Sequence, residues 1–252
     1  MEPNPTKLQR THDSLYLLEN RYEDPKQLHQ EIVRMIKRDH FHEAGMTLRS
    51  ITDAGCAAGE FAYLLKKEFK EVQIQGFDLL PILTSKARDK VSGAHFFESD
   101  ILEISSLPSS SQDIITCTGV LSIFDDFRTP IRNLIHWVKP GGYVYLHSLF
   151  SDYPFDVRIQ YNSSEEFGNG ILETGWNIFS KRSVTTYLTS LLENNLIHSF
   201  EFDDINLERE LAPQEDLVRS WTFKDHDGKL RVTNGLNILQ PHAILTIRKA
   251  FE

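Results

Sequence analysis

Apolar residues before residue 49 recur at spacings of three and four, first over 15–22 and again over 32–36. This period matches one face of an α-helix and predicts two helices before the first strand. From Ser50 onward, short apolar runs alternate with stretches of helical period. Such alternation is typical of βαβ units around a parallel sheet, so we expect an α/β protein.

Five strands and three intervening helices are predicted in the alternating region. The strands are Arg49–Asp53, Val72–Phe77, Ala94–Glu98, Asp113–Cys117 and Tyr143–His147. The helices are Glu60–Phe69, Pro81–Val91 and Arg128–Trp137. The serine-rich stretch 105–112 predicts an exposed loop.

The alternation stops after Phe150. Residues 151–180 contain aromatic side chains and glycines without a clear period, which predicts a long functional loop. A helix over Arg182–Asn194 and a long strand from Ile197 should follow. The pairs Asp227-Gly228 and Asn234-Gly235 are hairpin signals between extended runs. The carboxyl end is therefore predicted to add antiparallel strands to the sheet, the last over Ala243–Arg248.

These patterns divide the chain into two predicted parts. Residues 1–48 are expected to form an amino-terminal helical cap, and residues 49–252 a Rossmann-like, doubly wound and mostly parallel sheet with antiparallel strands at the carboxyl end. Insertions at about 151–180 and 208–240 are expected to cover a substrate. The length of 252 residues suits a single elaborated α/β domain.

The charge balance bears on the class of partner. The chain has 27 Lys and Arg against 36 Asp and Glu, a formal charge of -9. Binding to nucleic acid depends on neutralising phosphates, so we expect no nucleic-acid partner and favour a cationic or neutral ligand. The first residues lack an apolar segment, and no apolar run approaches the roughly 20 residues of a membrane span. We expect a cytoplasmic protein with no membrane contact; the oligomeric state is left open, with a homodimer as one option.

The most informative segment is Ile51–Phe61, which runs from a strand through small residues into a helix. Gly55 and Gly59 allow the backbone to approach a ligand closely and to adopt positive φ. Asp53 precedes them, where the dinucleotide fingerprint begins its glycine-rich turn. A carboxylate there would repel a pyrophosphate and attract an ammonium or sulfonium group.

Two further acids follow the next two strands. Asp78 lies where ribose hydroxyls are bound in nucleotide-binding α/β sheets. Asp100 could accept a hydrogen bond from an adenine amine, with Leu79 and Ile101 on either side of the base. Each acid also has a plain structural interpretation, since Asp commonly caps a helix or a turn. The carboxyl ends of parallel strands meet at one edge, so these acids should converge there.

At this point the sequence resembles the class I S-adenosylmethionine-dependent methyltransferases. The motifs that carry the resemblance are Asp53-Ala54-Gly55-Cys56-Ala57-Ala58-Gly59, Phe77-Asp78-Leu79, Ser99-Asp100-Ile101, Asp113-Ile114-Ile115-Thr116-Cys117 and Val138-Lys139-Pro140-Gly141-Gly142-Tyr143. The resemblance implies a sheet of seven strands, S-adenosylmethionine as cofactor and S-adenosylhomocysteine as product. The implied cofactor-binding residues are Asp53, Gly55, Cys56, Gly59, Asp78, Leu79, Asp100, Ile101, Thr118 and Gly119.

Methyl transfer from a sulfonium depends chiefly on alignment, which can contribute roughly 7–11 kcal/mol, against roughly 10²–10⁴-fold from a general base. His147, which closes the fifth strand, is our first candidate for such a base, with a packing role as the alternative. His12 is a second candidate if the amino-terminal segment folds over the cleft. No metal is expected: His40 and His42 lack a third ligand, and Asp125-Asp126 is typical of a helix cap.

Aromatic residues gather in the segments expected to bound the methyl acceptor. The predicted substrate-binding residues are Tyr16, Tyr22, Tyr153, Trp176 and Trp221. The carboxyl-terminal part is similar to small-molecule methyltransferases of natural-product and surface-sugar pathways. We therefore expect methylation of an oxygen or nitrogen atom of a small molecule. The alternatives are an NAD(P)-dependent oxidoreductase, which fits Asp78 but not Asp53 or Asp100, and a non-catalytic S-adenosylmethionine-binding protein.

Overall fold

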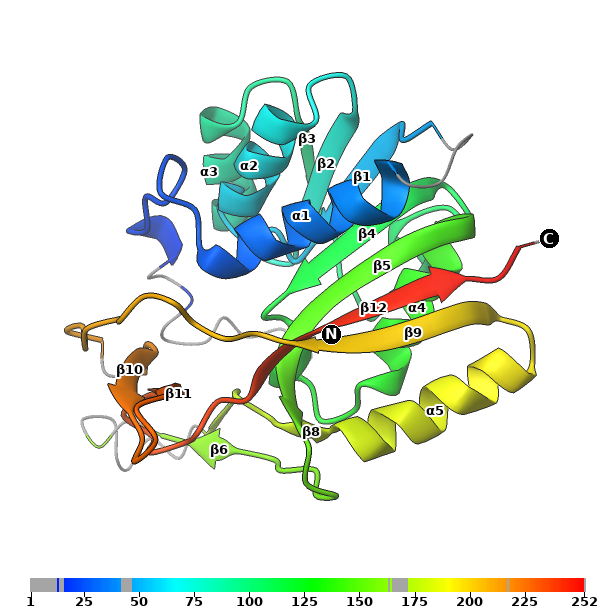
Figure 1. Cartoon of the computed structure of the whole chain (residues 1–252). Coiled ribbons are helices and arrows are strands. Elements are labelled where there is room, and N and C mark those ends of the chain that lie inside the picture. The colour runs from blue at the N-terminus through cyan, green and yellow to red at the C-terminus, as the bar shows by residue number, and fades with distance from the viewer. Residues whose placement is uncertain are drawn as a thin grey trace, which may run out of the picture.

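The computed structural model describes residues 13, 16–41, 47–162, 164, 172–216 and 218–251. Its main sheet follows the order β3-β2-β1-β4-β5-β12-β9, with the short β8 (Phe179–Ser180) beside β5 (Figure 1). The strands are β1 (Ser50–Ala54), β2 (Gln73–Asp78), β3 (His95–Glu98), β4 (Gln112–Thr118), β5 (Val138–Ser151), β9 (Ile197–Asp204) and β12 (His242–Lys249). All five strands predicted between residues 49 and 147 are therefore present.

Strand direction divides the sheet. The strands β1 to β5 pair in parallel, whereas β12 is antiparallel to both of its neighbours. In Figure 1 the arrowhead of β12 accordingly points away from that of β4. The predicted Rossmann-like, mostly parallel sheet with antiparallel addition at the carboxyl end is confirmed.

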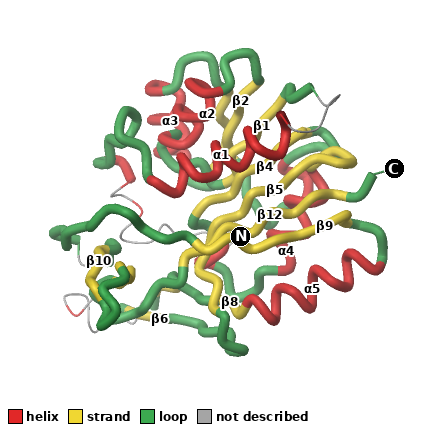
Figure 2. The backbone as a smooth tube through the Cα atoms, in the orientation of Figure 1, coloured by secondary structure: helices red, strands yellow, loops and turns green. Residues whose placement is uncertain are grey.

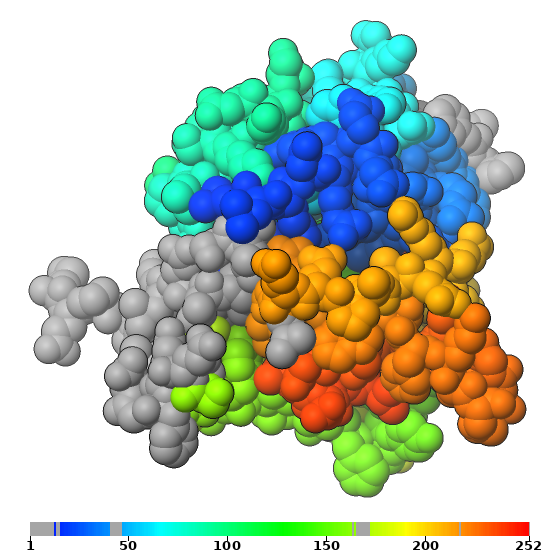
Figure 3. All heavy atoms as spheres, turned by 90° about the vertical axis from the view of Figure 1, so that its left-hand side faces the viewer, coloured from blue at the N-terminus to red at the C-terminus, as the bar shows by residue number. Residues whose placement is uncertain are grey.

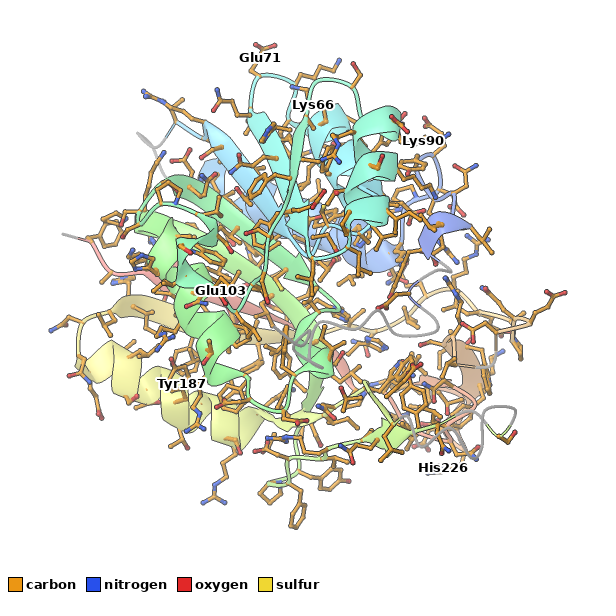
Figure 4. The ribbon with its side chains drawn as sticks, turned by 180° about the vertical axis from the view of Figure 1, so that it is seen from behind. Lys66, Glu71, Lys90, Glu103, Tyr187 and His226 are labelled. Carbon is orange, nitrogen blue, oxygen red and sulfur yellow. The ribbon has the colours of Figure 1, made fainter. Side chains whose placement is uncertain are left out.

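Helices cover both faces of this sheet. They are α1 (Gln27–Phe41), α2 (Glu60–Glu68), α3 (Pro81–Lys90), α4 (Arg128–Trp137) and α5 (Lys181–Glu193). Apolar residues of α1, α2 and α3 form one buried cluster, and those of α4 and α5 form the other. Figure 1 looks onto the face that α1 covers, and Figure 4 shows α4 from the opposite side. The chain thus buries its sheet between two helical layers.

The predicted helix over 15–22 does not form. Residues 16 and 17 make a short 3₁₀ turn, and the chain is then irregular until α1 begins. Its backbone groups find distant partners instead: Lys86 Nζ donates to the carbonyl oxygens of residues 16, 17 and 19 at 3.2, 2.7 and 2.8 Å. Leu18 is 79 % exposed, so the apolar period there does not mark a buried face. The second predicted helix is confirmed as α1.

Two pairs of short strands lie outside the main sheet. The turn at Asp227-Gly228 joins β10 (Trp221–Lys224) to β11 (Leu230–Thr233) as an antiparallel hairpin, as predicted. This hairpin forms its own two-stranded sheet. Asn234-Gly235 makes a turn between β11 and β12, which do not pair, so the hairpin prediction is wrong there. Within the predicted loop, β6 (Gln160–Tyr161) pairs with β7 (Glu173–Thr174).

The carboxyl ends of the parallel strands determine where a ligand can bind. Loops gather at these ends, on the left of Figure 2, together with the β10–β11 hairpin. In Figure 3 the amino-terminal segment in blue lies directly against residues in orange from the carboxyl-terminal insertion. Gln27 joins these two segments, since its side chain bonds the backbone of Asn206 and Glu208. Separately, no helix in the described part of the chain has the length and apolarity to cross a membrane.

Candidate active site

A cavity of about 1330 Å³ opens at the carboxyl ends of the parallel strands. Its walls come from three parts of the chain: the loops after β1, β2, β3 and β4 with the end of β5, residues 13–29 of the amino-terminal segment, and residues drawn from 172–176 and 205–242. The predicted convergence of the strand-tip residues at one edge is therefore seen in the structure. Ligand sites typically occupy about 300–1,000 Å³, so this space exceeds that of a single small ligand.

The loop between β1 and α2 forms one wall through its backbone. Gly55 has φ of +75°, and the amide nitrogens of Gly55 and Cys56 both donate to Phe77 O, at 2.8 and 3.0 Å. A Cβ on Gly55 would lie 2.3 Å from Val120 Cγ2. Glycine is thus required at position 55 both by its positive φ and by this close approach. Gly55 and Cys56 line the cavity.

Gly59 packs closely against α3. It lies just before α2 and does not line the cavity. A Cβ at this position would meet Ala87 of α3 at 2.9 Å. This close approach explains a glycine at the helix start, and the cofactor-binding role of Gly59 stays a prediction.

Asp53 is buried at the tip of β1 and lines the cavity. Thr116 Oγ1 donates to its Oδ1 at 2.9 Å. Burial raises the pKa of Asp53 to about 7, and the negative charge of Asp78 adds to this effect. No lysine or arginine within the described ranges forms an ion pair with this carboxyl. A bound cation would relieve this unfavourable burial, because it favours the ionised carboxylate.

Asp78 ends β2 and joins two loops. Its Oδ2 accepts from the amide of Ala57 at 2.9 Å, and its Oδ1 accepts from the amide of Leu80 at 3.0 Å. Burial raises the pKa of Asp78, while these hydrogen bonds act in the opposite direction. A carboxylate has about four lone-pair sites, so both oxygens keep capacity for ligand hydroxyls. The capping and ribose-binding interpretations of Asp78 are thus compatible.

Asp100 also combines both interpretations. Its Oδ1 accepts from the amide of Leu102 at 2.9 Å, which is a turn cap, and its side chain lines the cavity. Leu79 and Ile101 line the cavity as well. Thr118 and Gly119, at the tip of β4, complete this wall, and a Cβ on Gly119 would meet nothing within 4 Å. Open space faces the backbone where the cofactor was expected to pass.

These residues fit S-adenosylmethionine on two observations. Asp53 is a buried carboxyl without a cationic partner in the described structure, which suits a sulfonium or ammonium group. Asp78 and Asp100 follow β2 and β3 and line the same cavity, where they can accept from hydroxyl and amine groups of a nucleoside. A pyrophosphate would instead meet the negative charge of these acids.

His147 lies in β5 and lines the cavity. Its ring is buried, and its Nε2 is 2.9 Å from Nδ1 of His242, with the two rings stacked. Burial lowers the pKa of His147 well below its usual value, so the ring is neutral at physiological pH. Its Nδ1 is buried without a hydrogen-bond partner. Leaving such an atom unpaired typically costs about 1–3 kcal/mol, which a donor on a bound molecule would recover.

The other predicted side chains divide into two groups. Tyr16 and Trp176 line the cavity. Tyr22 is buried beside it, where its hydroxyl donates to Ala58 O at 2.8 Å, so it holds the amino-terminal segment to the β1–α2 loop. Tyr153 is 74 % exposed, and neither it nor Trp221, which pairs within the β10–β11 hairpin, lines the cavity. The structure does not bring these last three to the acceptor space. His12 lies outside the described residues.

Several lining residues were missed at the level of the sequence. Gln240 precedes β12, His242 begins it, and His29 lies on α1. Arg219 contacts Glu19 across 200 residues, and Glu19 also pairs with Lys26 at 3.5 Å. No short motif marks such contacts, because both partners are ordinary charged or polar residues far apart in the chain. A histidine beside the last strand was the only available signal.

The candidate metal ligands serve other purposes. Asp126 Oδ1 accepts from the amide of Arg128, the first residue of α4, and the Arg128 guanidinium also donates to this carboxylate, so Asp126 is engaged beside the N-cap Phe127. Among the described residues, Asp225, His226 and Asp227 are the group that could hold a metal ion, and they form the turn of the β10–β11 hairpin. His226 lies at the outer edge of the molecule (Figure 4), away from the cavity.

Comparisons with known proteins agree with this geometry. Residues 17–191 match the methyltransferase domain family. The chain is 28 % identical over 176 residues to phosphoethanolamine N-methyltransferase of Triticum aestivum, which covers 66 % of this chain and 32 % of the wheat protein. The chain thus spans about a third of the length of that relative.

Solved structures share the fold. The N-methyltransferase NodS from Bradyrhizobium japonicum, in complex with S-adenosylhomocysteine, is 17 % identical with a TM-score of 0.51, over 90 % of this chain and 89 % of NodS. The [4+2]-cyclase SpnF is 16 % identical with a TM-score of 0.60, over 99 % of both chains. At such identities the likeness concerns the fold alone. The family match over most of the chain carries the assignment: the chain belongs to the methyltransferase domain family and has the class I methyltransferase fold.

Proposed function

We propose that this methyltransferase acts on a small molecule and methylates one of its oxygen or nitrogen atoms. The observation that carries the proposal is the size and enclosure of the cavity, about 1330 Å³, bounded by the strand tips, residues 13–29 and the carboxyl-terminal insertion. This space suits a nucleoside cofactor together with a second small ligand. Residues 13–29 act in this proposal as a cap over the acceptor, as expected for the amino-terminal part.

Each wall has a distinct task in the reaction. Asp53, Asp78 and Asp100 would hold the cofactor, which when bound supplies an electrophilic methyl group and is converted to S-adenosylhomocysteine. Tyr16 and Trp176 offer aromatic faces to the acceptor and help to exclude water. The acceptor must lose a proton as its lone pair takes the methyl group, and His147 is the base that we propose for it.

The charges of the lining residues favour a neutral or cationic acceptor. Four basic side chains line the described part of the cavity, and each pairs with an acid of the protein. Arg21, Lys26 and Arg219 pair with Glu19, and Arg209 pairs with Asp24. A phosphate or carboxylate on the acceptor would have to compete with these pairs. A neutral or cationic acceptor would differ in charge from the phosphate ester in the name of the wheat relative.

The aromatic lining and the likeness of the carboxyl-terminal part favour a sugar-like or natural-product acceptor. The test is a screen of such hydroxyl and amine compounds with isotope-labelled S-adenosylmethionine, with a double variant, Asp78→Ala with His147→Ala, as the inactive control. Transfer of label to a neutral or cationic small molecule, absent in the control, supports the proposal. Label transfer only to protein, RNA or an anionic metabolite contradicts it, and cofactor binding without transfer to any acceptor favours a non-catalytic binding protein.

A further inference from the structure

A chain of four side chains runs from the carboxyl-terminal insertion to His147. Ser220 Oγ donates to Gln240 Oε1 at 2.7 Å, and Gln240 Oε1 also lies 3.2 Å from His242 Nε2. His242 Nδ1 lies 2.9 Å from His147 Nε2. All four residues line the cavity.

The direction of this chain sets the tautomers of both histidines. A carbonyl oxygen can only accept, so Nε2 of His242 carries the proton that points to Gln240. The pKa of His242 is lowered by burial to about 4, so its ring is neutral and Nδ1 has a lone pair. Nε2 of His147 must then carry the proton shared with His242. Nδ1 of His147 is left as a lone-pair nitrogen, and it is the ring nitrogen without a partner.

We propose that Ser220, Gln240 and His242 orient His147 so that its Nδ1 accepts the proton of the methyl acceptor. This inference rests on the proposed function, since it concerns the same reaction. The proton moves from the reacting O–H or N–H group to Nδ1, and the ring becomes an imidazolium that still donates through Nε2 to His242. His147 touches the acceptor, and His242 is a positioning residue.

The surroundings of His147 support this role. Lys26 just before α1, His29 of α1 and His242 of β12 are the charged or titratable groups that act on it; none of them is an acid, and all three lower its pKa. The neutral, proton-accepting form is therefore the resting state. Gln240 Nε2 is also buried without a partner. The cluster thus contains one donor and one acceptor without a partner in the described structure, and a hydroxyl group can both donate and accept.

The tautomer can be measured without any substrate. Long-range ¹H–¹⁵N spectra of the wild-type chain, labelled at its histidine rings, separate a lone-pair nitrogen from a protonated one. The signals of His147 are assigned by their loss in His147→Gln. We expect a proton on Nε2 and none on Nδ1. A proton on Nδ1 would mean that the Gln240 amide is turned the other way, and it would overturn the inference.

Two matched variants test the positioning role. His242→Asn keeps an acceptor beside Nε2 of His147, whereas His242→Leu removes it. We expect His242→Leu to lower kcat about 10- to 100-fold, the range for removing a partner that orients an imidazole, with the Kd for S-adenosylmethionine within about twofold of wild type. We expect His242→Asn to retain most of the turnover and the wild-type tautomer of His147.

If His242→Leu does not fold, Gln240→Leu and Gln240→Glu form a second pair, because glutamate keeps the accepting oxygen. Turnover should fall in Gln240→Leu and persist in Gln240→Glu. Equal losses in the conservative and the apolar variants, or unchanged turnover in His242→Leu, would overturn the inference. Methyl transfer that needs His147 but not His242 would leave the proposed function standing.

Discussion

The two sides of the cavity are built in different ways. On the cofactor side, Asp53, Asp78 and Asp100 lie at or just past the ends of parallel strands. Their hydrogen-bond partners lie nearby: Thr116 of β4 for Asp53, the loop residues Ala57 and Leu80 for Asp78, and Leu102 for Asp100. On the acceptor side, residues nearly 200 positions apart make the contacts. Glu19 meets Arg219, and Gln27 bonds the backbone of Asn206.

This difference shows which kind of binding site can be recognised from short segments of a sequence. A cofactor shared by a whole family can be recognised by short loops after strands, because the sheet itself brings those loops together. An acceptor particular to one enzyme is bound by segments that meet only when the chain has folded. Variants on the two sides should therefore separate cofactor affinity from turnover and acceptor affinity.

The largest expected effect is on turnover. His147→Ala should lower kcat about 10²- to 10⁴-fold, the contribution of a positioned general base, and leave the Kd of S-adenosylmethionine unchanged. Steady-state kinetics together with calorimetry measures both quantities. His226→Ala, at an exposed turn, is the matched control. Unchanged turnover in His147→Ala would remove this residue as the base.

Variants on the cofactor side should weaken the binding of S-adenosylmethionine. Asp78→Ala removes a carboxylate that accepts from two loops and is expected to accept from ribose hydroxyls. Hydrogen bonds to a charged group contribute about 1.5–3 kcal/mol each, so the Kd for S-adenosylmethionine should rise about 10- to 100-fold. Asp89→Ala on the exposed side of α3 should leave it unchanged. Retained affinity in Asp78→Ala would count against the ribose role.

Asp53 predicts a pH dependence of cofactor binding. The pKa of this carboxyl is raised to about 7, so in the free protein it binds a proton below that pH. A bound cation favours the ionised form, so binding releases the proton and affinity falls as the pH falls through 7. We expect the Kd of S-adenosylmethionine to be about tenfold higher at pH 6 than at pH 8, and Asp53→Asn to lose this dependence. A wild-type Kd that does not change over this range would exclude the pairing.

The smallest effect is expected where the two terminal segments meet. Arg219→Ala removes a partly buried partner of Glu19, while Lys26 and Arg21 remain beside that carboxylate. The KM of the acceptor should rise about fivefold, which corresponds to about 1 kcal/mol, with the cofactor Kd unchanged. Arg209→Ala, in an exposed pair with Asp24, should have almost no effect. Equal effects of both variants would argue against a specific role for the Arg219 contact.

Much of the fold follows from local pattern. The predicted strand Arg49–Asp53 and the observed Ser50–Ala54 differ by one residue at each end, and the helix Arg128–Trp137 is found as predicted. The failure over 15–22 has a physical cause, since that segment bonds Lys86 and the β1–α2 loop rather than itself. The spacing of apolar residues indicates only that a helix could have a buried face. It does not report partners that lie 70 residues away.

The candidate site was predictable to the same extent. Asp53, Asp78, Asp100 and Gly119 line the cavity as expected, because each is fixed by the strand that precedes it. Tyr153 and Trp221 do not, since aromatic composition alone cannot tell a wall from an exposed loop or a hairpin. His147 was found from its place in β5. Its contact with His242 depends on the antiparallel register of β12, in which His242 lies opposite Leu149. That register could not be predicted from the sequence.

The most direct test of the strand-tip acids is a calorimetric titration of S-adenosylmethionine into the wild-type protein at pH 8, with NADH as the comparison ligand. We predict saturable binding of S-adenosylmethionine, accompanied by proton release when repeated near pH 7, and no binding of NADH. Absence of any heat or thermal shift with S-adenosylmethionine, or equal binding of NADH, would contradict the account.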